Sequence, residues 1–294
     1  MPICIAHADS DGIISTALLL KVKNQNKFKL IFSSAPRLKQ SLVNLIIKNL
    51  NKNEVYIFDL SSSEITLALA STFDHVIWID HHVWDDLTIP KNVEVFVKQS
   101  ESAAKLVAEY FEVEDELVEI ANEIDRNNVK SEEAKFLRDL ISSIKWKFAI
   151  NFRKQEQLYK KIALTLAFDK LNNLKTQFKE LLQEFNSWLK IFEEQFRKNL
   201  EFYEMNDLKI AIYQNSGFIP IYWLLNKVEE KIDILIVLSY LKNKTKIELR
   251  SLTGKNVLPL AKYYGGGGHK QACGATVNNL IQKEEILEKI KKML

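Results

Sequence analysis

The chain has 294 residues, enough for roughly two domains, and its 47% hydrophobic content is ample for ordinary globular cores. A formal net charge of only +3 excludes binding to nucleic acid through a strong overall field. The two cysteines, Cys4 and Cys273, are too few for a disulfide framework or a thiolate zinc site. No apolar run reaches the ~20 residues of a membrane span, and the start lacks the pattern of a signal peptide. We therefore expect a cytoplasmic protein with no membrane partner.

The first 130 residues alternate short apolar runs with amphipathic segments. The apolar runs are 3–6, 29–34, 54–58, 75–79 and 93–97, and the segments with helical periodicity are 12–23, 37–50, 62–71 and 102–111. This alternation of strands and helices predicts a parallel sheet with helices packed on its faces. We expect an N-terminal α/β domain over residues 1–130.

The pattern changes over residues 131–206, where apolar residues recur at helical spacing without any Gly or Pro. It predicts two or three long helices, a helical connector whose aromatic stripe we interpret as packing. Strand-like runs then return at 208–214, 232–241 and 244–252, before a last helical stretch at 283–294. We expect a smaller C-terminal α/β domain over residues 207–294.

Side chains that bind metals follow three of the predicted strands. In chain order they are His7, Asp9 and Asp11 after the first run, Asp59 after the third, and Asp80, His81 and His82 after the fourth. Ligands bind outside the carboxyl ends of the strands in open parallel sheets, so we expect these side chains to converge. Carboxylates gathered in one crevice repel one another unless cations neutralise them. Mixed imidazole and carboxylate ligands suit Mn²⁺, and less selectively Zn²⁺, Fe²⁺ or Co²⁺. A pair of such ions is a common device for hydrolysing phosphoesters.

A further acidic ligand is expected after the last helix of this domain. Asp125 ends the segment ELVEIANEID and is the best-placed candidate, with Glu123 and Asp115 behind it. Aspartate is also a favoured helix cap, which is the alternative interpretation of Asp9, Asp11 and Asp125.

The C-terminal part contains a basic run and a glycine-rich segment. Between Tyr240 and Ala272 the only acid is Glu248, whereas Lys and Arg recur throughout. Such a run favours an anionic ligand, although a solvated lysine-rich face is the commoner explanation. The four glycines at 265–268 supply backbone amides that can approach a phosphate closely; the alternative is a hairpin or hinge.

Together these motifs resemble a known family. HADSDG at 7–12, Asp59, DHH at 80–82, Asp125 and GGGGHKQACG at 265–274 are similar to the five signatures of the DHH phosphoesterase superfamily, in its DHH–DHHA1 branch. That branch includes RecJ-like single-strand exonucleases, their archaeal relatives, nanoRNA and pAp phosphatases, and cyclic-dinucleotide phosphodiesterases. The first motif is spaced more tightly than in the family's pyrophosphatases and nanoRNases, and more closely resembles that of archaeal RecJ-type proteins.

The resemblance implies two Mn²⁺ ions, for which Mg²⁺ or Co²⁺ could substitute. The implied metal ligands are His7 and Asp9 for one ion, Asp11, His81 and Asp125 for the other, and Asp59 as the bridge. Which ion Asp9 and Asp11 each prefer is left open. Asp59, Asp80 and His82 form the implied catalytic set, in which Asp80 orients the imidazoles and His82 donates to the substrate phosphate. The implied site for a terminal nucleotide comprises His82, Arg250, Ser251, Gly265, Gly266, Gly267, Gly268 and His269.

The resemblance further implies a Mn²⁺-dependent phosphodiesterase that hydrolyses single-stranded or short DNA or RNA from one end. One alternative is a small-molecule phosphatase acting on pAp, cyclic dinucleotides or polyphosphate. Another is a catalytically silent replication scaffold of the Cdc45 type, which the intact HADSDG and DHH motifs disfavour. Replication or repair proteins are candidate partners, and the sequence leaves the oligomeric state open, a dimer included.

Overall fold

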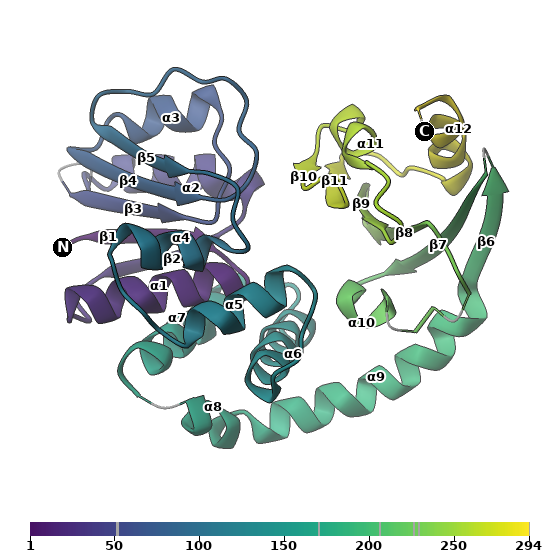
Figure 1. Ribbon diagram of the computed structural model, residues 1–294, viewed down its shortest axis with the longest axis horizontal. Helices are drawn as coiled ribbons and strands as arrows, with labels where there is room; N and C mark the ends of the chain where they lie inside the picture. The colour runs from purple at the N-terminus through teal and green to yellow at the C-terminus, as the bar shows by residue number, and fades with distance from the viewer. Residues whose placement is uncertain (51–52, 170, 206, 226, 229, 294) are drawn as a thin grey trace. The chain divides into compact units, whose positions relative to one another are not determined.

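The computed structural model describes residues 1–50, 53–169, 171–205, 207–225, 227–228 and 230–293. These residues form two compact units, 1–183 and 184–294, and each unit contains a sheet of its own (Figure 1). The boundary falls within the long helix α9 (Lys179–Asn199). Across the described ranges, no helix combines the length and the apolarity that crossing a membrane requires.

The first unit is built on a five-stranded sheet in the order β2-β1-β3-β4-β5. Its strands are β1 (Ile3–His7), β2 (Lys29–Ser33), β3 (Glu54–Phe58), β4 (His75–Asp80) and β5 (Val93–Val97). Every neighbouring pair is parallel, which confirms the predicted N-terminal α/β fold. The order makes β1, β3 and β4 neighbours, so the three strands that precede the motif residues lie side by side.

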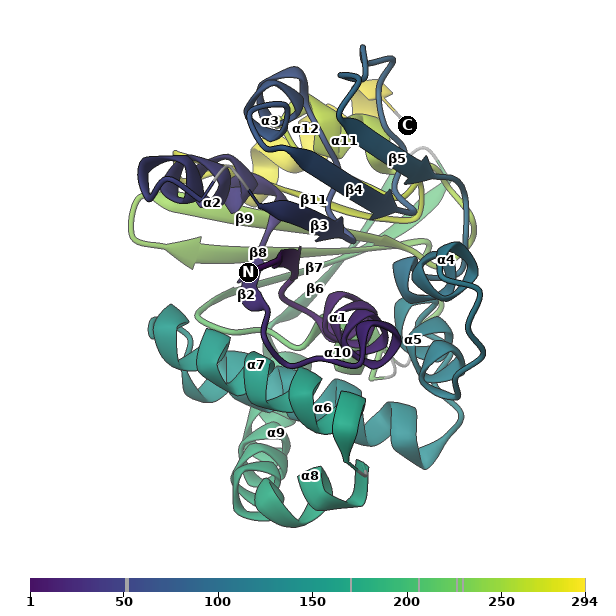
Figure 2. The same cartoon turned by 90° about the vertical axis from the view of Figure 1, so that its left-hand side faces the viewer.

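Helices cover both faces of this sheet (Figure 2). They are α1 (Ser10–Lys23), α2 (Ala35–Ile47), α3 (Glu64–Ala70), α4 (Ala103–Tyr110), α5 (Leu117–Asp125), α6 (Glu132–Lys147), α7 (Phe152–Phe168) and α8 (Leu171–Gln177). Successive strand residues point to opposite faces. Cys4 and Ala6 therefore pack in one core with α1 and α4 to α8, whereas Ile3 and Ile5 pack in another with α2 and α3.

The predicted helical connector is helical throughout most of its length. Helices α6, α7 and α8 pack in the same core as α1, through residues such as Leu137, Tyr159 and Leu174. This part of the connector therefore forms one face of the first unit. The segment limits 1–130, 131–206 and 207–294 stay a prediction, since packing units and functional domains are different divisions of a chain.

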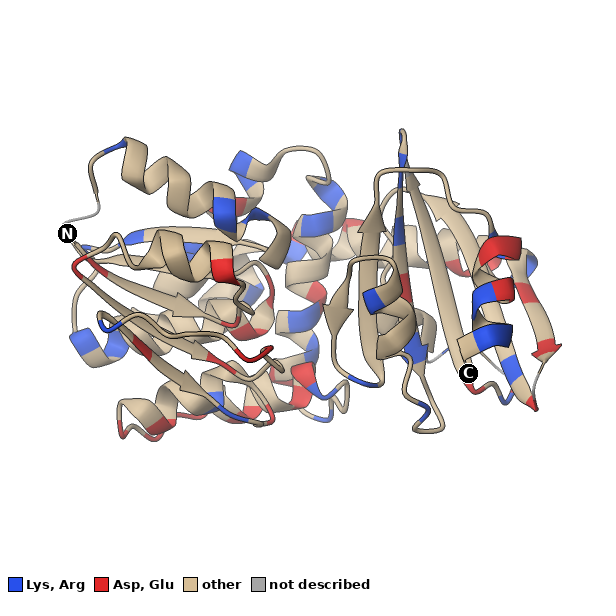
Figure 3. Ribbon diagram, turned by 90° about the horizontal axis from the view of Figure 1, so that it is seen from above, with Lys and Arg blue, Asp and Glu red and all other residues tan. Residues whose placement is uncertain are grey.

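The second unit is a mixed α/β structure, as expected for the smaller C-terminal domain. Its sheet has the order β10-β11-β9-β8-β7-β6, with β7 and β8 parallel and the other pairs antiparallel. Its elements are β6 (Leu200–Met205), β7 (Leu208–Ser216), α10 (Ile221–Leu225), β8 (Ile234–Leu241), β9 (Lys244–Ser251), α11 (Leu258–Tyr263), β10 (Gly267–Gly268), β11 (Ala272–Val277) and α12 (Lys283–Met293). Basic and acidic residues are interspersed on α12 (Figure 3), whose apolar Ile286 and Ile290 face the core.

Candidate metal centre

Asp59 lies at the middle of the cluster formed at the carboxyl ends of β1, β3 and β4. It directly follows β3 and has a left-handed backbone, with φ 57°. Its amide donates to the carbonyl of Ile79 at 3.0 Å, so the pairing with β4 continues as far as Asp59. A left-handed non-glycine residue costs on the order of 1–3 kcal/mol, and such strain concentrates at functional sites. The carboxylate is 3% exposed.

One group of potential ligands consists of His7, Asp9 and Asp59. Nδ1 of His7 lies 2.6 Å from Oδ2 of Asp9 and 3.4 Å from Oδ2 of Asp59. Asp9 is also the N-cap of α1, where its Oδ1 accepts from the amide of Gly12 at 3.1 Å. Oδ2 of Asp59 is buried and accepts no hydrogen bond from the described residues. A buried carboxylate oxygen in that state is costly, and a cation is the partner that suits it.

The electrostatics of this group are dominated by the carboxylates. Burial lowers the pKa of His7, but the charges of Asp9 and Asp59 more than offset it and raise that pKa well above its usual value. Burial raises the pKa of Asp9, but His7, Lys145 and the Gly12 amide outweigh it, so the pKa lies well below the ordinary range. Lys145 belongs to α6, and the sequence interpretation assigned no chemistry to that helix.

A second group consists of Asp11, Asp59 and His81. Nε2 of His81 lies 3.6 Å from Oδ1 of Asp59, 3.8 Å from Oδ2 of Asp11 and 3.7 Å from Oδ2 of Asp125. Its Nδ1 is 3.3 Å from the carbonyl oxygen of Ser100. A carbonyl can only accept, so this contact places a ring proton on Nδ1 and leaves Nε2, which faces the carboxylates, as the nitrogen that could bind a metal once it loses its own proton. Asp59 is thus common to both groups, the position that the resemblance gives to the bridging ligand.

Asp11 has a structural contact in addition to its place in this cluster. Its Oδ2 accepts from the amide of Ala103 at 2.7 Å, and its Oδ1 accepts from the amide of Ala104 at 2.8 Å. These amides begin α4, so Asp11, in the first turn of α1, ties that helix to residues 92 and 93 positions later in the chain. Each carboxylate oxygen has a second lone pair, which leaves capacity for a cation.

Negative charge is in excess around His81. Burial raises the pKa of Asp125 to about 7, with repulsion from Asp59 adding to it and His81 opposing it. Burial, with repulsion from Asp59 and Asp125, also raises the pKa of Asp11 well above its usual value. Burial lowers the pKa of His81, but the carboxylates outweigh it and raise the value to about 10. In the absence of a cation, protons on Asp125, Asp11 and His81 partly compensate the negative charge of the carboxylates. A divalent ion could displace these protons and compensate the charge instead.

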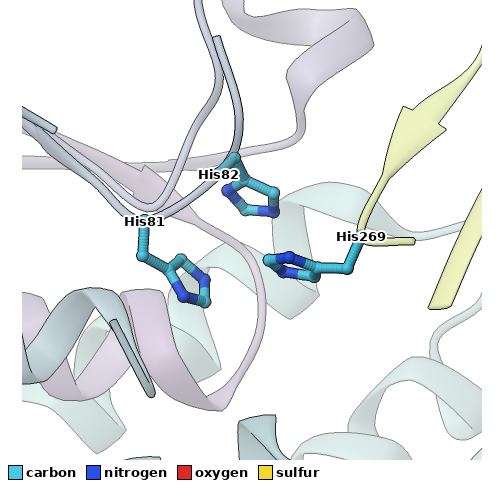
Figure 4. Close-up of side chains that lie close together, drawn as sticks. All are labelled: His81, His82 and His269. Atoms are coloured by element: carbon cyan, nitrogen blue, oxygen red, sulfur yellow. The ribbon is translucent and has the colours of Figure 1, made fainter. Parts of the chain in front are cut away.

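Asp80, the last residue of β4, and His82 form a third part of the site. The imidazole of His82 lies beside that of His81 (Figure 4). Oδ1 of Asp80 lies 2.7 Å from Nδ1 of His82, and its Oδ2 accepts from the indole of Trp84 at 2.7 Å. We expected Asp80 to orient both imidazoles. The contacts divide that task, because Asp80 holds His82 whereas the Ser100 carbonyl contacts His81. Burial raises the pKa of Asp80, but its bond to His82 outweighs burial and lowers it. The sequence did not identify Ser100 or Trp84 as part of the site. The one local signal was the position of Trp84 at the end of the segment WIDHHVW (residues 78–84), four residues after Asp80.

In the second unit, the predicted nucleotide-binding residues gather where β9 ends and β11 begins. Arg250 stands opposite Ala272, and the amide of Ser251 donates to the carbonyl of Gln271 at 2.8 Å. The amide of His269 donates to Ala272 at 2.9 Å, which closes a tight turn before β11. The hydroxyl of Ser251 is buried and has no hydrogen-bond partner among the described residues.

The glycine-rich loop differs from the expectation that its amides are available to a phosphate. The amide of Gly265 donates to Lys262 and that of Gly266 to Ala261, both at 2.9 Å. With Gly265 at φ 72°, these two bonds form a Schellman motif that ends α11. Two of the four amides are therefore committed to the helix end. Gly267 and Gly268 pair with β11.

The donor set of the first unit fits divalent cations of the Mn²⁺ type. It offers imidazole nitrogen and carboxylate oxygen, a combination that suits Mn²⁺ and, less selectively, other divalent first-row metals. The buried, unbonded Oδ2 of Asp59 and the raised pKa of Asp125 are both observations that a bound cation would account for. The individual ligand assignments stay predictions.

Comparisons with family models agree with this architecture. A model described as "DHH family, N-terminal domain" matches residues 3–137, and one described as "DHHA1 domain" matches residues 207–294. A search of curated protein sequences found no match for the chain.

Several solved structures share the fold over nearly the whole chain. The pGpG-specific phosphodiesterase PggH from Vibrio cholerae aligns over 99% of this chain and 97% of its own, with 16% identity and a TM-score of 0.62. An exopolyphosphatase-related protein from Bacteroides fragilis aligns over 99% and 92%, with 16% identity and a TM-score of 0.56. Exonuclease RecJ bound to manganese aligns over 99% and 88%, with 16% identity and a TM-score of 0.53. At such identities these likenesses establish the fold.

Proposed function

The chain belongs to the DHH–DHHA1 phosphoesterase superfamily, a group of phosphoester hydrolases, and we propose that it is a Mn²⁺-dependent phosphodiesterase that shortens single-stranded oligonucleotides from one end. The observation that carries this proposal is the position of Asp59. It is shared between one ligand group with His7 and Asp9 and another with Asp11 and His81. A shared carboxylate between two sets of ligands is the arrangement by which two ions are held close together.

Short substrates are supported by the share of each related protein that aligns with this chain. PggH, a phosphodiesterase specific for pGpG, matches this chain over almost the whole of both proteins. RecJ, an exonuclease, has the same fold but extends further beyond the match. We therefore propose oligonucleotides of a few residues, linear dinucleotides included, as the preferred substrates.

Each part of the site has its own task in this proposal. His7, Asp9, Asp11, His81 and Asp125, with Asp59 between them, would hold two divalent ions. Bound there, such ions would supply Lewis-acid activation of the phosphate. Asp80 keeps the His82 imidazole oriented, so that His82 donates to a non-bridging phosphate oxygen as charge develops.

The second unit would hold the end of the substrate. Arg250 offers a planar fork of donors that can pair with a terminal phosphate or stack on a base. The buried hydroxyl of Ser251 and the imidazole of His269 lie at the same end of β9 and β11. A pocket for one terminus, rather than a long groove, would give digestion from an end.

A panel of labelled substrates tests the proposal. The purified chain would be incubated with Mn²⁺ and with DNA and RNA of two to twenty nucleotides, labelled at either end. We expect stepwise shortening, fastest for the shortest RNA or DNA, and none with the Asp59→Ala variant. Hydrolysis of pAp, cyclic dinucleotides or polyphosphate alone would identify a small-molecule phosphatase instead. No hydrolysis of any substrate, with no bound Mn²⁺ on metal analysis, would favour a silent scaffold.

A further inference from the structure

Trp84 contacts the site through a buried carboxylate, although it lies outside the DHH motif. Its indole Nε1 donates to Oδ2 of Asp80 at 2.7 Å, while the other oxygen of Asp80 lies 2.7 Å from Nδ1 of His82. Asp80 is 0% exposed. One carboxylate thus joins an indole on one side to an imidazole on the other.

Trp84 is itself held in place by the core under β4. Its ring packs edge-on against Trp78, with ring centroids 5.2 Å apart and an interplanar angle of 79°. Trp78 is fully buried, and its own indole donates to the carbonyl of Leu60 at 2.8 Å. The donor that reaches Asp80 therefore comes from a ring with a fixed position, and not from a flexible side chain.

Two fixed partners define the plane of the Asp80 carboxylate. Terminal torsions of aspartate are broad, so a carboxylate with a single partner can turn about its last bond. Because Asp80 is excluded from solvent, water cannot replace a lost donor without rearrangement. Removal of the indole N–H would leave Oδ2 unsatisfied and release the constraint on Oδ1, the atom that holds His82.

We propose that Trp84 is a positioning residue for His82, acting through Asp80 to fix the direction in which the imidazole faces the substrate phosphate. That His82 faces a phosphate rests on the proposed function, whereas the contacts that lead from Trp84 to His82 are independent of it. A purely structural Trp84 would fill space over Trp78 and would act on the fold, without any specific dependence on His82.

The variant Trp84→Phe isolates the hydrogen bond, because phenylalanine keeps an aromatic ring against Trp78 and lacks the N–H. We expect kcat on a short oligonucleotide to fall about tenfold, with KM and the Mn²⁺ dissociation constant unchanged within about twofold, as for a misaligned transition-state donor. Trp223→Phe is the matched control. It removes an indole from α10, where the ring contacts Phe192 and Lys227, and should leave kcat unchanged.

A double-mutant cycle separates positioning from a structural role. In a His82→Ala background, Trp84→Phe should lower kcat by less than about twofold, because the residue through which Trp84 acts is gone. An equal tenfold loss in both backgrounds would overturn the proposal. If Trp84→Phe fails to fold, Trp84→Gln and Trp84→Ala give the same contrast. Only glutamine offers an N–H, so only glutamine should recover part of the rate.

A spectroscopic measurement separates failure of this inference from failure of the proposed function. The His82 Nδ1–H proton, assigned by its absence in His82→Ala, should give a downfield resonance in the ¹H–¹⁵N spectrum of the wild type. We expect it to broaden or move upfield in Trp84→Phe and to persist in Trp223→Phe. An unchanged resonance in Trp84→Phe would overturn the positioning role whatever the substrate. A wild type inactive on every oligonucleotide would reject the proposed function, and the resonance would still decide the role of Trp84.

Discussion

The cluster around Asp59 and the glycine-rich loop of the second unit are built in different ways. The cluster consists of side chains gathered at the carboxyl ends of parallel strands, and its negative charges are in excess and either buried or half-buried. The loop consists of backbone, and its conformation is set by the end of α11 and by the pairing of β10 with β11. Changes in the cluster should therefore alter chemistry while the fold persists. Changes at the closely packed glycines should alter the fold first.

The largest effect is expected for Asp59→Asn. This change keeps the size of the side chain but removes the charge shared by the two ligand groups. Activity with Mn²⁺ should fall by about 10³-fold or more, in the range of losses of a central electrostatic group. Isothermal titration should show at most one tightly bound Mn²⁺ where the wild type binds two.

The metal-free Asp59→Asn protein should be as stable as the wild type or more so, since repulsion between buried carboxylates is relieved. Thermal melting with a chelator checks this expectation. A metal-free variant that is unfolded at room temperature would contradict the distinction between the two regions.

The neighbouring histidines should fail in different ways. His81→Ala removes an imidazole whose Nε2 faces Asp11, Asp59 and Asp125, so Mn²⁺ affinity should fall about 10- to 100-fold along with the rate. His82→Ala should lower kcat about 100-fold with Mn²⁺ affinity unchanged. Titration of Mn²⁺ and single-turnover kinetics on both variants measure the contrast. Identical behaviour of the two would show that the roles are not divided.

Two adjacent glycines provide the matched test of the loop. A Cβ at Gly266 would lie 2.1 Å from the carbonyl oxygen of Gly274, whereas a Cβ at Gly267 has no atom within 4 Å. Gly266→Ala should therefore destabilise the protein by about 2–4 kcal/mol, as overpacking against backbone does. Gly267→Ala should leave the free energy of unfolding unchanged, and urea denaturation of both measures the difference. If Gly267→Ala nonetheless raises KM, the open position over this glycine lies in the substrate site.

The sequence predicted the position of the cluster because one general rule covers it. Metal-binding side chains follow neighbouring parallel strands, and the carboxyl ends of parallel strands meet at one edge of the sheet. His7, Asp59 and His81 could therefore be brought together without any knowledge of side-chain geometry. The parallel sheet itself followed from the alternation of apolar runs and helical segments.

The rest depended on contacts between distant residues that no local pattern records. The bonds from Asp11 to the amides of Ala103 and Ala104 link positions that carry no shared motif. Lys145 comes near Asp9 only because α6 packs in the same core as α1, which periodicity alone does not indicate. The glycine loop was interpreted from composition, and composition cannot distinguish an amide that ends a helix from one that binds an anion.

The raised pKa of Asp125 predicts that Mn²⁺ binding depends on pH. Burial and the repulsion of Asp59 raise the pKa of Asp125 to about 7 in the metal-free protein. Below that pH the carboxyl holds a proton that a metal must displace, so the Mn²⁺ dissociation constant should fall about tenfold per pH unit up to pH 7 for each proton released. Titrations in buffers of different ionisation enthalpy count the protons, and Asp125→Asn should release about one fewer.

The same raised pKa fixes the sign of the stability change without metal. Unfolded aspartate ionises near pH 4, whereas Asp125 in the folded chain keeps its proton until about pH 7. The folded state therefore binds more protons over this interval, and its stability falls as pH rises from 4 to 7. The raised pKa of Asp11 acts in the same direction over this interval, whereas that of His81, raised from 6.5 to about 10, continues the decrease in stability at higher pH. Melting temperatures with a chelator should decrease over this range, whereas saturating Mn²⁺ should remove the decrease. In Asp125→Asn the decrease should be shallower, because one of the repelling groups no longer ionises.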